Sequence, residues 1–140
     1  MSAAVIAIVA GLTLAGLTGW LLTRRSGVLQ ETGSASGQAL DVDTSDLGIA
    51  DSGPTVVHFS APWCGPCVGV RRVVDQVCTD LGGVAHVEID IDTNPTAARK
   101  LSVLSLPTTL IFDAHGRQRY RATGVPAAAD LRSALEPLLA

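Results

Sequence analysis

The chain has 140 residues, which is enough for one domain of ordinary size together with an extension. Its formal net charge of −3 excludes the strongly basic character of nucleic-acid-binding domains, so we expect no nucleic-acid partner. Three cysteines are too few for a disulfide-stapled scaffold, and a domain of this size does not need one.

The first segment of the chain is long and apolar. Residues 3–22, AAVIAIVAGLTLAGLTGWLL, contain no charged residue and no proline. A helix of this length is about 30 Å long, which matches the hydrocarbon core of a bilayer. A cleaved signal peptide fits less well, because Met1 and Ser2 provide no basic n-region and the apolar stretch exceeds the usual ~7–15 residues. We therefore expect a transmembrane helix with Trp20 at the membrane interface.

Arg24 and Arg25 follow the apolar segment directly, which disfavours a buried helix of a soluble protein. They are the only positive side chains that flank the segment. The positive-inside rule places their side in the cytoplasm, with the N-terminal amine competing weakly. The sequence thus predicts a single-pass anchor over residues 1–25 in the cell membrane, with the rest of the chain on the cytoplasmic side.

A linker is expected after the anchor. Residues 26–38, SGVLQETGSASGQ, are rich in glycine and serine and show no apolar period. This composition is typical of a flexible tether, and a tether of this length spans about 20 Å on average. We expect it to free the domain, residues 39–140, from the membrane surface while keeping the domain near it.

Strand and helix patterns alternate through the domain. The run TVVHFS is β-branched and aromatic, which predicts a buried strand, and apolar residues at spacings of three and four predict a helix that Gly82 and Gly83 end. Turn residues separate the later elements. In chain order we expect a short strand at 39–42, one helical turn from residue 44, strands at 55–60, 84–91, 108–112 and 118–123, and helices at 67–81, 94–101 and from 126.

This order predicts an α/β fold with one central mixed β-sheet. Alternation of strands and helices implies a parallel portion, and the last two strands add an antiparallel hairpin. Helices are expected to flank the sheet, and the transmembrane helix precedes the whole domain.

Cys64 and Cys67 lie between a predicted strand and a predicted helix, in the stretch APWCGPCV. At the helix start, unpaired backbone N–H groups and the helix dipole favour an anion, so we expect a lowered pKa for the Cys64 thiol. Cys67 follows one turn later and further into the fold. Pro66 is tolerated because its missing N–H has no helical partner in the first turn. This spacing supports attack by Cys64 and resolution by Cys67 through a mixed disulfide.

Three different roles for the cysteine pair are less well supported. A zinc site usually needs two such pairs, and the remaining cysteine and the three histidines form none, so we expect no metal site. A structural disulfide that closes so short a loop stabilises little. A pair of inert, buried thiols is also less well supported, because the neighbouring Trp63 and Pro66 are more typical of an exposed turn. Cys78 lies on the apolar stripe of its helix and is expected in the core.

The motifs WCGPC at 63–67, TVVHFSAP before it and SLPTTLIF at 105–112 together resemble the thioredoxin family, over residues 39–140. The resemblance implies a thioredoxin-like fold, with Cys64 as nucleophile and Cys67 as resolving cysteine. Pro107 matches the family's cis-proline, beside which the Leu106 backbone would pair with an extended substrate segment. Gly65 and Pro66 match the dipeptide of reducing members. Trp63 and Gly124 match residues that border the substrate groove.

The chain departs from the family at several positions. His58 replaces a buried aspartate that is thought to handle the proton of the resolving cysteine. With a reference pKa of about 6.5, His58 could act as base toward Cys67, or it could be a neutral histidine bonded to backbone; the sequence leaves both roles open. Glu88 replaces a lysine that pairs with that aspartate, Ser60 replaces a tryptophan, and Val68 replaces a lysine.

The sequence predicts a membrane-anchored thiol-disulfide oxidoreductase that reduces protein disulfides. A cytoplasmic domain would work at a reducing poise and would receive electrons from an upstream reductase or a membrane electron carrier. No organic cofactor is expected, because the dithiol carries both electrons. Two alternatives stay open: disulfide exchange in the cell envelope, if the domain lies outside, and a tethered thioredoxin-fold module for binding or assembly.

Overall fold

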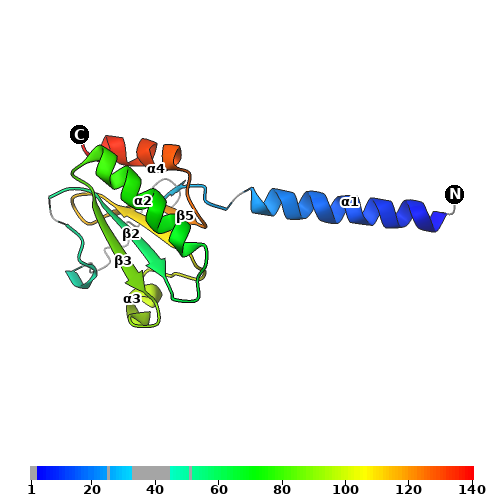
Figure 1. Ribbon diagram of the computed structural model, residues 1–140, viewed down its shortest axis with the longest axis horizontal. Coiled ribbons are helices and arrows are strands. Elements are labelled where there is room, and N and C mark those ends of the chain that lie inside the picture. Colours follow the sequence, from blue (N-terminus) through cyan, green and yellow to red (C-terminus); the bar gives the residue numbers. More distant parts are fainter. Residues whose placement is uncertain (1–2, 25, 33–44, 51) are drawn as a thin grey trace.

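The computed structural model describes residues 3–24, 26–32, 45–50 and 52–140 (Figure 1). The strand expected at 39–42 and the linker residues 33–38 lie outside these ranges. The first element is α1, Ala3–Thr23, which projects from a globular domain.

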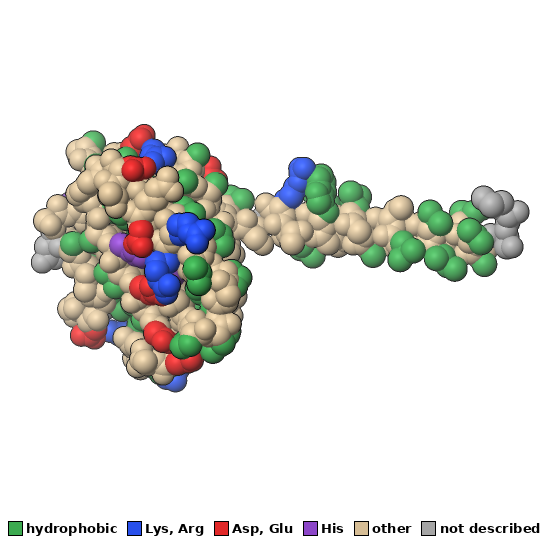
Figure 2. Space-filling view, in the orientation of Figure 1, with side chains coloured by type: hydrophobic (Ala, Val, Ile, Leu, Met, Phe, Trp, Pro, Cys, Tyr) green, Lys and Arg blue, Asp and Glu red, His purple; other side chains and the backbone are tan. Residues whose placement is uncertain are grey.

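Helix α1 is the one helix of the described residues that is long and apolar enough to cross a membrane. None of its side chains is buried. Figure 2 shows hydrophobic side chains along its length, whereas acidic and basic side chains gather on the domain. A helix that is hydrophobic on all sides is stable when it is enclosed in a protein core or in a membrane. No core encloses α1 in the described part of the chain.

The domain is built on a five-stranded sheet in the order β1-β5-β4-β2-β3. The interior strand β2, Thr55–Ser60, runs parallel to β3, Ala85–Asp90, and antiparallel to β4, Thr108–Phe112. Strand β5, Gln118–Thr123, forms the predicted hairpin with β4. The mixed sheet predicted from the sequence is confirmed, and every residue of β2 is buried, as its β-branched and aromatic residues predict.

Helices cover both faces of the sheet. On one face, α2, Cys67–Leu81, and α4, Ala128–Leu135, pack over Val56 and Ile111. On the other face, α3, Pro95–Lys100, and the short helix η1, Ser45–Leu47, pack over Phe59 and Leu110. A last turn, η2, Glu136–Leu138, follows α4, which begins two residues after Pro126. Since side chains alternate along a strand, His58 shares the α2 face with Val56.

A short strand lies within the segment expected to be a linker. Strand β1, Gln30–Glu31, pairs antiparallel with β5, and the backbone N–H of Thr32 donates to the Arg119 carbonyl at 2.8 Å. Leu29 packs against the core cluster beneath α2 and α4. The edge of β5 supplies hydrogen bonds that composition cannot reveal, and the packing of Leu29 adds an apolar contact beside them.

Candidate active site

The two cysteines lie in the connection between β2 and α2, where the sequence placed them. The backbone N–H of Cys64 donates to the Ala61 carbonyl at 3.0 Å, and that of Cys67 donates to the Cys64 carbonyl at 3.3 Å. Helix α2 begins at Cys67 with Pro66 as its N-cap, so Cys64 precedes the helix instead of opening it. These two turns bring the cysteine Cα atoms to 5.5 Å, and the sulfurs form a disulfide.

The two sulfurs differ in their surroundings. Cys64 is 8% exposed and Cys67 is 2% exposed, and both pack with Ala61 and Leu106. The Sγ atom of Cys67 lies 3.9 Å from the carbonyl oxygen of Phe59 in β2. Cys67 is therefore the more enclosed of the two buried cysteines, and Cys64 is the one that a partner can approach more easily.

The residues expected to border a substrate groove lie around the cysteine pair. The Leu106–Pro107 peptide bond is cis, as the resemblance implied, and Leu106 packs against the disulfide. Gly124 has a φ of 86° and donates its backbone N–H to the Pro107 carbonyl at 2.9 Å, which ties the end of β5 to this loop. Gly65 and Pro66 form the exposed turn between the two cysteines.

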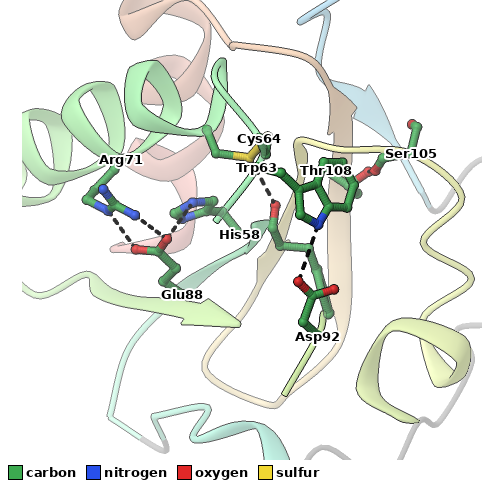
Figure 3. The surroundings of a disulfide bond; sticks show 10 residues. His58, Trp63, Cys64, Arg71, Glu88, Asp92, Ser105 and Thr108 are labelled. Carbon is green, nitrogen blue, oxygen red and sulfur yellow. Dashed lines mark hydrogen bonds and ion pairs between the residues drawn. A yellow bond between two sulfur atoms is a disulfide. The ribbon is translucent and has the colours of Figure 1, made fainter. Parts of the chain in front are cut away.

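Trp63 lies beside the disulfide (Figure 3). The residue is 68% exposed, and its Nε1–H donates to Asp92 Oδ2 at 3.3 Å. A hollow next to it is lined by apolar side chains that include Leu104 and Leu106. An exposed aromatic ring held by one hydrogen bond is well suited to contact a bound chain.

His58 is fully buried, and its ring nitrogens face side chains, not the cysteines. Its Nδ1 lies 3.0 Å from His86 Nε2, and its Nε2 lies 3.6 Å from Glu88 Oε1. Figure 3 shows Glu88 between His58 and Arg71, which forms two hydrogen bonds to the carboxylate at 2.7 and 2.5 Å. In the described part of the chain, no hydrogen bond joins His58 to either cysteine.

A row of polar side chains thus runs from solvent to the buried histidine. His86 Nδ1 lies 2.6 Å from Oδ1 of the exposed Asp75 on α2, and His86 leads on to His58. Arg71, Asp75 and His86 were not predicted as partners of His58 from the sequence. Two periodicities could have indicated them: residues 86 and 88 share a face of β3, and residues 71 and 75 share a face of α2.

The charges in this row follow from burial and pairing. The hydrogen bond from Arg71 lowers the pKa of Glu88 to about 2, so this carboxylate is ionised at neutral pH. Burial lowers the pKa of His58 to about 4, although the Glu88 charge opposes this effect, so the imidazole is neutral at neutral pH. Burial also raises the pKa of the Cys78 thiol to about 11, which makes that thiol a poor nucleophile.

The position of the protons on the two histidine rings decides which ring nitrogens donate and which accept in this row. The Asp75 carboxylate only accepts, so His86 donates from Nδ1. Without a second proton, His86 Nε2 accepts from the Nδ1–H of His58, whose Nε2 is then an unprotonated, buried atom without a partner. With a second proton on His86, the bond reverses and His58 carries its proton on Nε2, toward Glu88.

Comparison with known proteins agrees with this geometry. A family model described as Thioredoxin matches residues 39–137. The chain is 37% identical over 82 residues to a thioredoxin from Mycolicibacterium smegmatis, covering 56% of this chain and 73% of the relative. A thioredoxin from Staphylococcus saprophyticus is 40% identical over 62 residues, and the chain spans 60% of its length and aligns over 44% of its own.

Solved structures show the same fold. A mutant thioredoxin from Halobacterium salinarum superposes with a TM-score of 0.59 at 28% identity, covering 75% of this chain and 88% of the other. The region that the family model matches includes β2 and α2, the strand and the helix that position the cysteine pair. The disulfide ahead of α2, the family model and the relatives lead to one conclusion: the chain belongs to the thioredoxin family of thiol-disulfide oxidoreductases.

Proposed function

We propose that this chain reduces protein disulfides through Cys64 and Cys67 while α1 anchors it in the cell membrane. The observation that carries the proposal is the unequal burial of a cysteine pair close enough to close a disulfide. A substrate would approach Cys64, the less buried residue, and Cys67 would attack a partner already bound to Cys64. This is the arrangement that exchange through a mixed disulfide requires.

The reaction begins from the reduced dithiol. The Cys64 thiolate attacks one sulfur of the substrate disulfide, which forms a mixed disulfide and releases the other substrate sulfur as a thiolate that takes up a proton. Cys67 then loses its proton and attacks the Cys64 sulfur, which closes the Cys64–Cys67 disulfide and releases the second substrate thiolate. The substrate gains two electrons, and the chain loses two. No organic cofactor takes part in this scheme.

The surface beside the pair supports a polypeptide substrate. Trp63 and Leu104 expose large apolar areas, at 68% and 95% of their surfaces. Apolar surface of this kind marks sites of protein interaction. The Leu106 backbone adds groups to which an extended segment can pair, as strand addition requires. Electrons would return from an upstream reductase or a membrane electron carrier.

We also propose that His58 accepts the proton of Cys67. Its low pKa opposes stable transfer from a thiol, whose ordinary pKa is about 8.5, so His58 would hold the proton only transiently. Superimposable pH profiles of disulfide reduction for the wild type and His58→Ala would exclude the role.

Insulin reduction by dithiothreitol tests the main proposal, with the full chain in detergent. We expect the wild type and Cys78→Ser, the matched control, to accelerate insulin precipitation equally, because Cys78 lies outside the pair. Cys64→Ser should abolish the acceleration. Cys67→Ser should abolish turnover and accumulate a mixed disulfide with the substrate. Equal turbidity curves for all four proteins would instead favour a tethered binding or assembly module.

A further inference from the structure

The junction between α1 and the domain contains almost no free chain. The backbone N–H of Ser26 donates to the Thr23 carbonyl at the end of α1, at 3.2 Å. The next residue, Gly27, donates its N–H to the Thr123 carbonyl at the end of β5, at 2.5 Å. From Thr23 to Gly27 the chain can extend at most about 14 Å. The domain therefore follows the helix almost directly.

Gly27 is suited to this junction by its lack of a side chain. It is buried with a φ of 84°, and a Cβ atom there would collide with the Val125 carbonyl. Opposite it, Gly124 has a φ of 86°, and a Cβ there would meet Gly27 N at 3.1 Å and Ser26 Cβ at 3.3 Å. Two glycines thus let two backbones approach closely. The contact continues along β1, which pairs with β5.

The junction lies next to the cysteine pair. Gly124, which faces Ser26 and Gly27, is hydrogen-bonded to Pro107, and the neighbouring Leu106 packs on the disulfide. Val125, which encloses Gly27, also lies against Gly69 in the first turn of α2. In Figure 1, α1 leaves the domain on the side where β2 ends and α2 begins. The anchor and the active site therefore share one end of the domain.

We propose that this junction, here called the glycine clamp (Gly27 and Gly124), holds the active site at the membrane surface for one kind of partner. That partner is an integral membrane protein whose reacting cysteine pair lies in a short segment at the lipid surface. The inference rests on the proposed function and on α1 spanning a bilayer. A flexible tether would let the domain turn its active site away from the lipid, whereas the clamp keeps the exposed apolar groups Trp63, Leu104 and Val125 near it.

The test uses the full chain reconstituted in phosphatidylcholine vesicles with two model substrates. Each substrate is a transmembrane peptide with one intramolecular disulfide, placed either directly after its apolar segment or beyond a long Gly/Ser spacer. We expect the wild type to reduce the near disulfide about 10-fold faster than the far one, because the clamp raises its effective concentration. Insulin in solution is the third substrate and reports the chemistry alone.

Two variants separate the clamp from folding. Gly27→Ala should remove the preference for the near disulfide, whereas Gly48→Ala, at a similar φ of 67° but with nothing within 4 Å of its Cβ, should keep it. A Gly/Ser spacer of about 20 Å inserted between Arg25 and Ser26 leaves the clamp intact and should also remove the preference.

The outcomes are distinguishable. A wild type that cannot reduce insulin would overturn the proposed function. A wild type that reduces insulin but treats near and far disulfides alike, or a spacer variant that keeps the preference, would overturn the clamp proposal.

Discussion

His58 shows how one buried side chain couples the stability of this domain to pH. The imidazole is fully enclosed between β2 and α2, with His86 on one nitrogen and the Glu88 carboxylate near the other. Arg71 and Asp75, which face the same group from α2, complete its charged surroundings. Burial outweighs the attraction of the carboxylates, so folding favours the neutral ring.

The unfolding free energy should therefore fall on acidification. Folded His58 binds a proton only below pH about 4, whereas the unfolded chain binds it at the ordinary value of 6.5. Between these values the unfolded chain holds more protons than the folded chain. The contribution of neutral His58 to the unfolding free energy is therefore fully present above pH 6.5. It is lost as the pH falls toward 4, by about 3 kcal/mol in total. Urea unfolding of the oxidised full chain in detergent, followed at several pH values, measures this slope.

His58→Leu should remove the slope between pH 6.5 and 4, and His115→Leu, which changes an exposed histidine, should leave it unchanged. An unaltered slope in His58→Leu would show that another group titrates.

At the scale of single residues, the sequence predicted the chemistry of the cysteines better than their surroundings. The WCGPC motif is local, so the positions of Cys64 and Cys67 between a strand and a helix could be predicted from neighbouring residues. The partners of His58 could not, because they depend on the register between strands and on the rotation of α2. Glu88, which replaces the family's lysine, forms an ion pair with Arg71 that was not predicted from the sequence.

At the scale of elements, the parallel pairing of β2 and β3 determines which charged and neutral side chains lie opposite each other beneath the disulfide. Its register places His58 opposite Glu88, with their side chains 3.6 Å apart. The carboxylate thus occupies β3, and the titratable partner in β2 is a neutral ring. The resemblance to thioredoxins implied the opposite arrangement, an acid in the first strand and a base in the second.

This cross-strand pair predicts the result of a charge swap. His58→Asp should destabilise the domain by about 3 kcal/mol at pH 7, because it buries a carboxylate beside an ionised one. Glu88→Lys alone should also destabilise, since it faces Arg71 with a second cation. Combined, the two changes restore opposite charges, and the double-mutant cycle should show a favourable coupling of about 1–3 kcal/mol. Strictly additive losses would mean that the two side chains do not interact.

Element boundaries were predictable where a pattern was long. The apolar stripe of α2 and the composition of β2 gave both elements with the bounds that the structure has. Strand β1 was missed because two residues carry no period and because its stability comes from the edge of β5, which is distant in sequence. The start of α4 differs by two residues from the expected proline, a difference that fraying of helix ends makes common.

At the scale of the whole molecule, the proposed membrane anchor makes the chemical role of the domain depend on the side of the membrane that the domain would occupy. A cytoplasmic domain meets a reducing poise and can act as a reductase, whereas an external domain would serve disulfide exchange in the envelope. The basic residues that follow α1, Arg24 and Arg25, predict the cytoplasmic side by the positive-inside rule. Arg24 also lies over the Trp20 ring, 3.5 Å from its centroid, which positions both at the expected interface.

The orientation is therefore expected to follow these charges. For detection, Glu136→Cys places a thiol on the exposed end of the domain, in a chain whose three natural cysteines are replaced by serine. With the natural flank, an impermeant maleimide should label this thiol only after cell lysis. Replacing Arg24 and Arg25 by glutamine while changing Ser2 and Ala3 to lysine reverses the charge bias, so labelling should then occur on intact cells. Labelling of the natural flank on intact cells would place the domain outside and assign it to envelope disulfide exchange, with the same two cysteines and the same clamp facing the opposite surface of the bilayer.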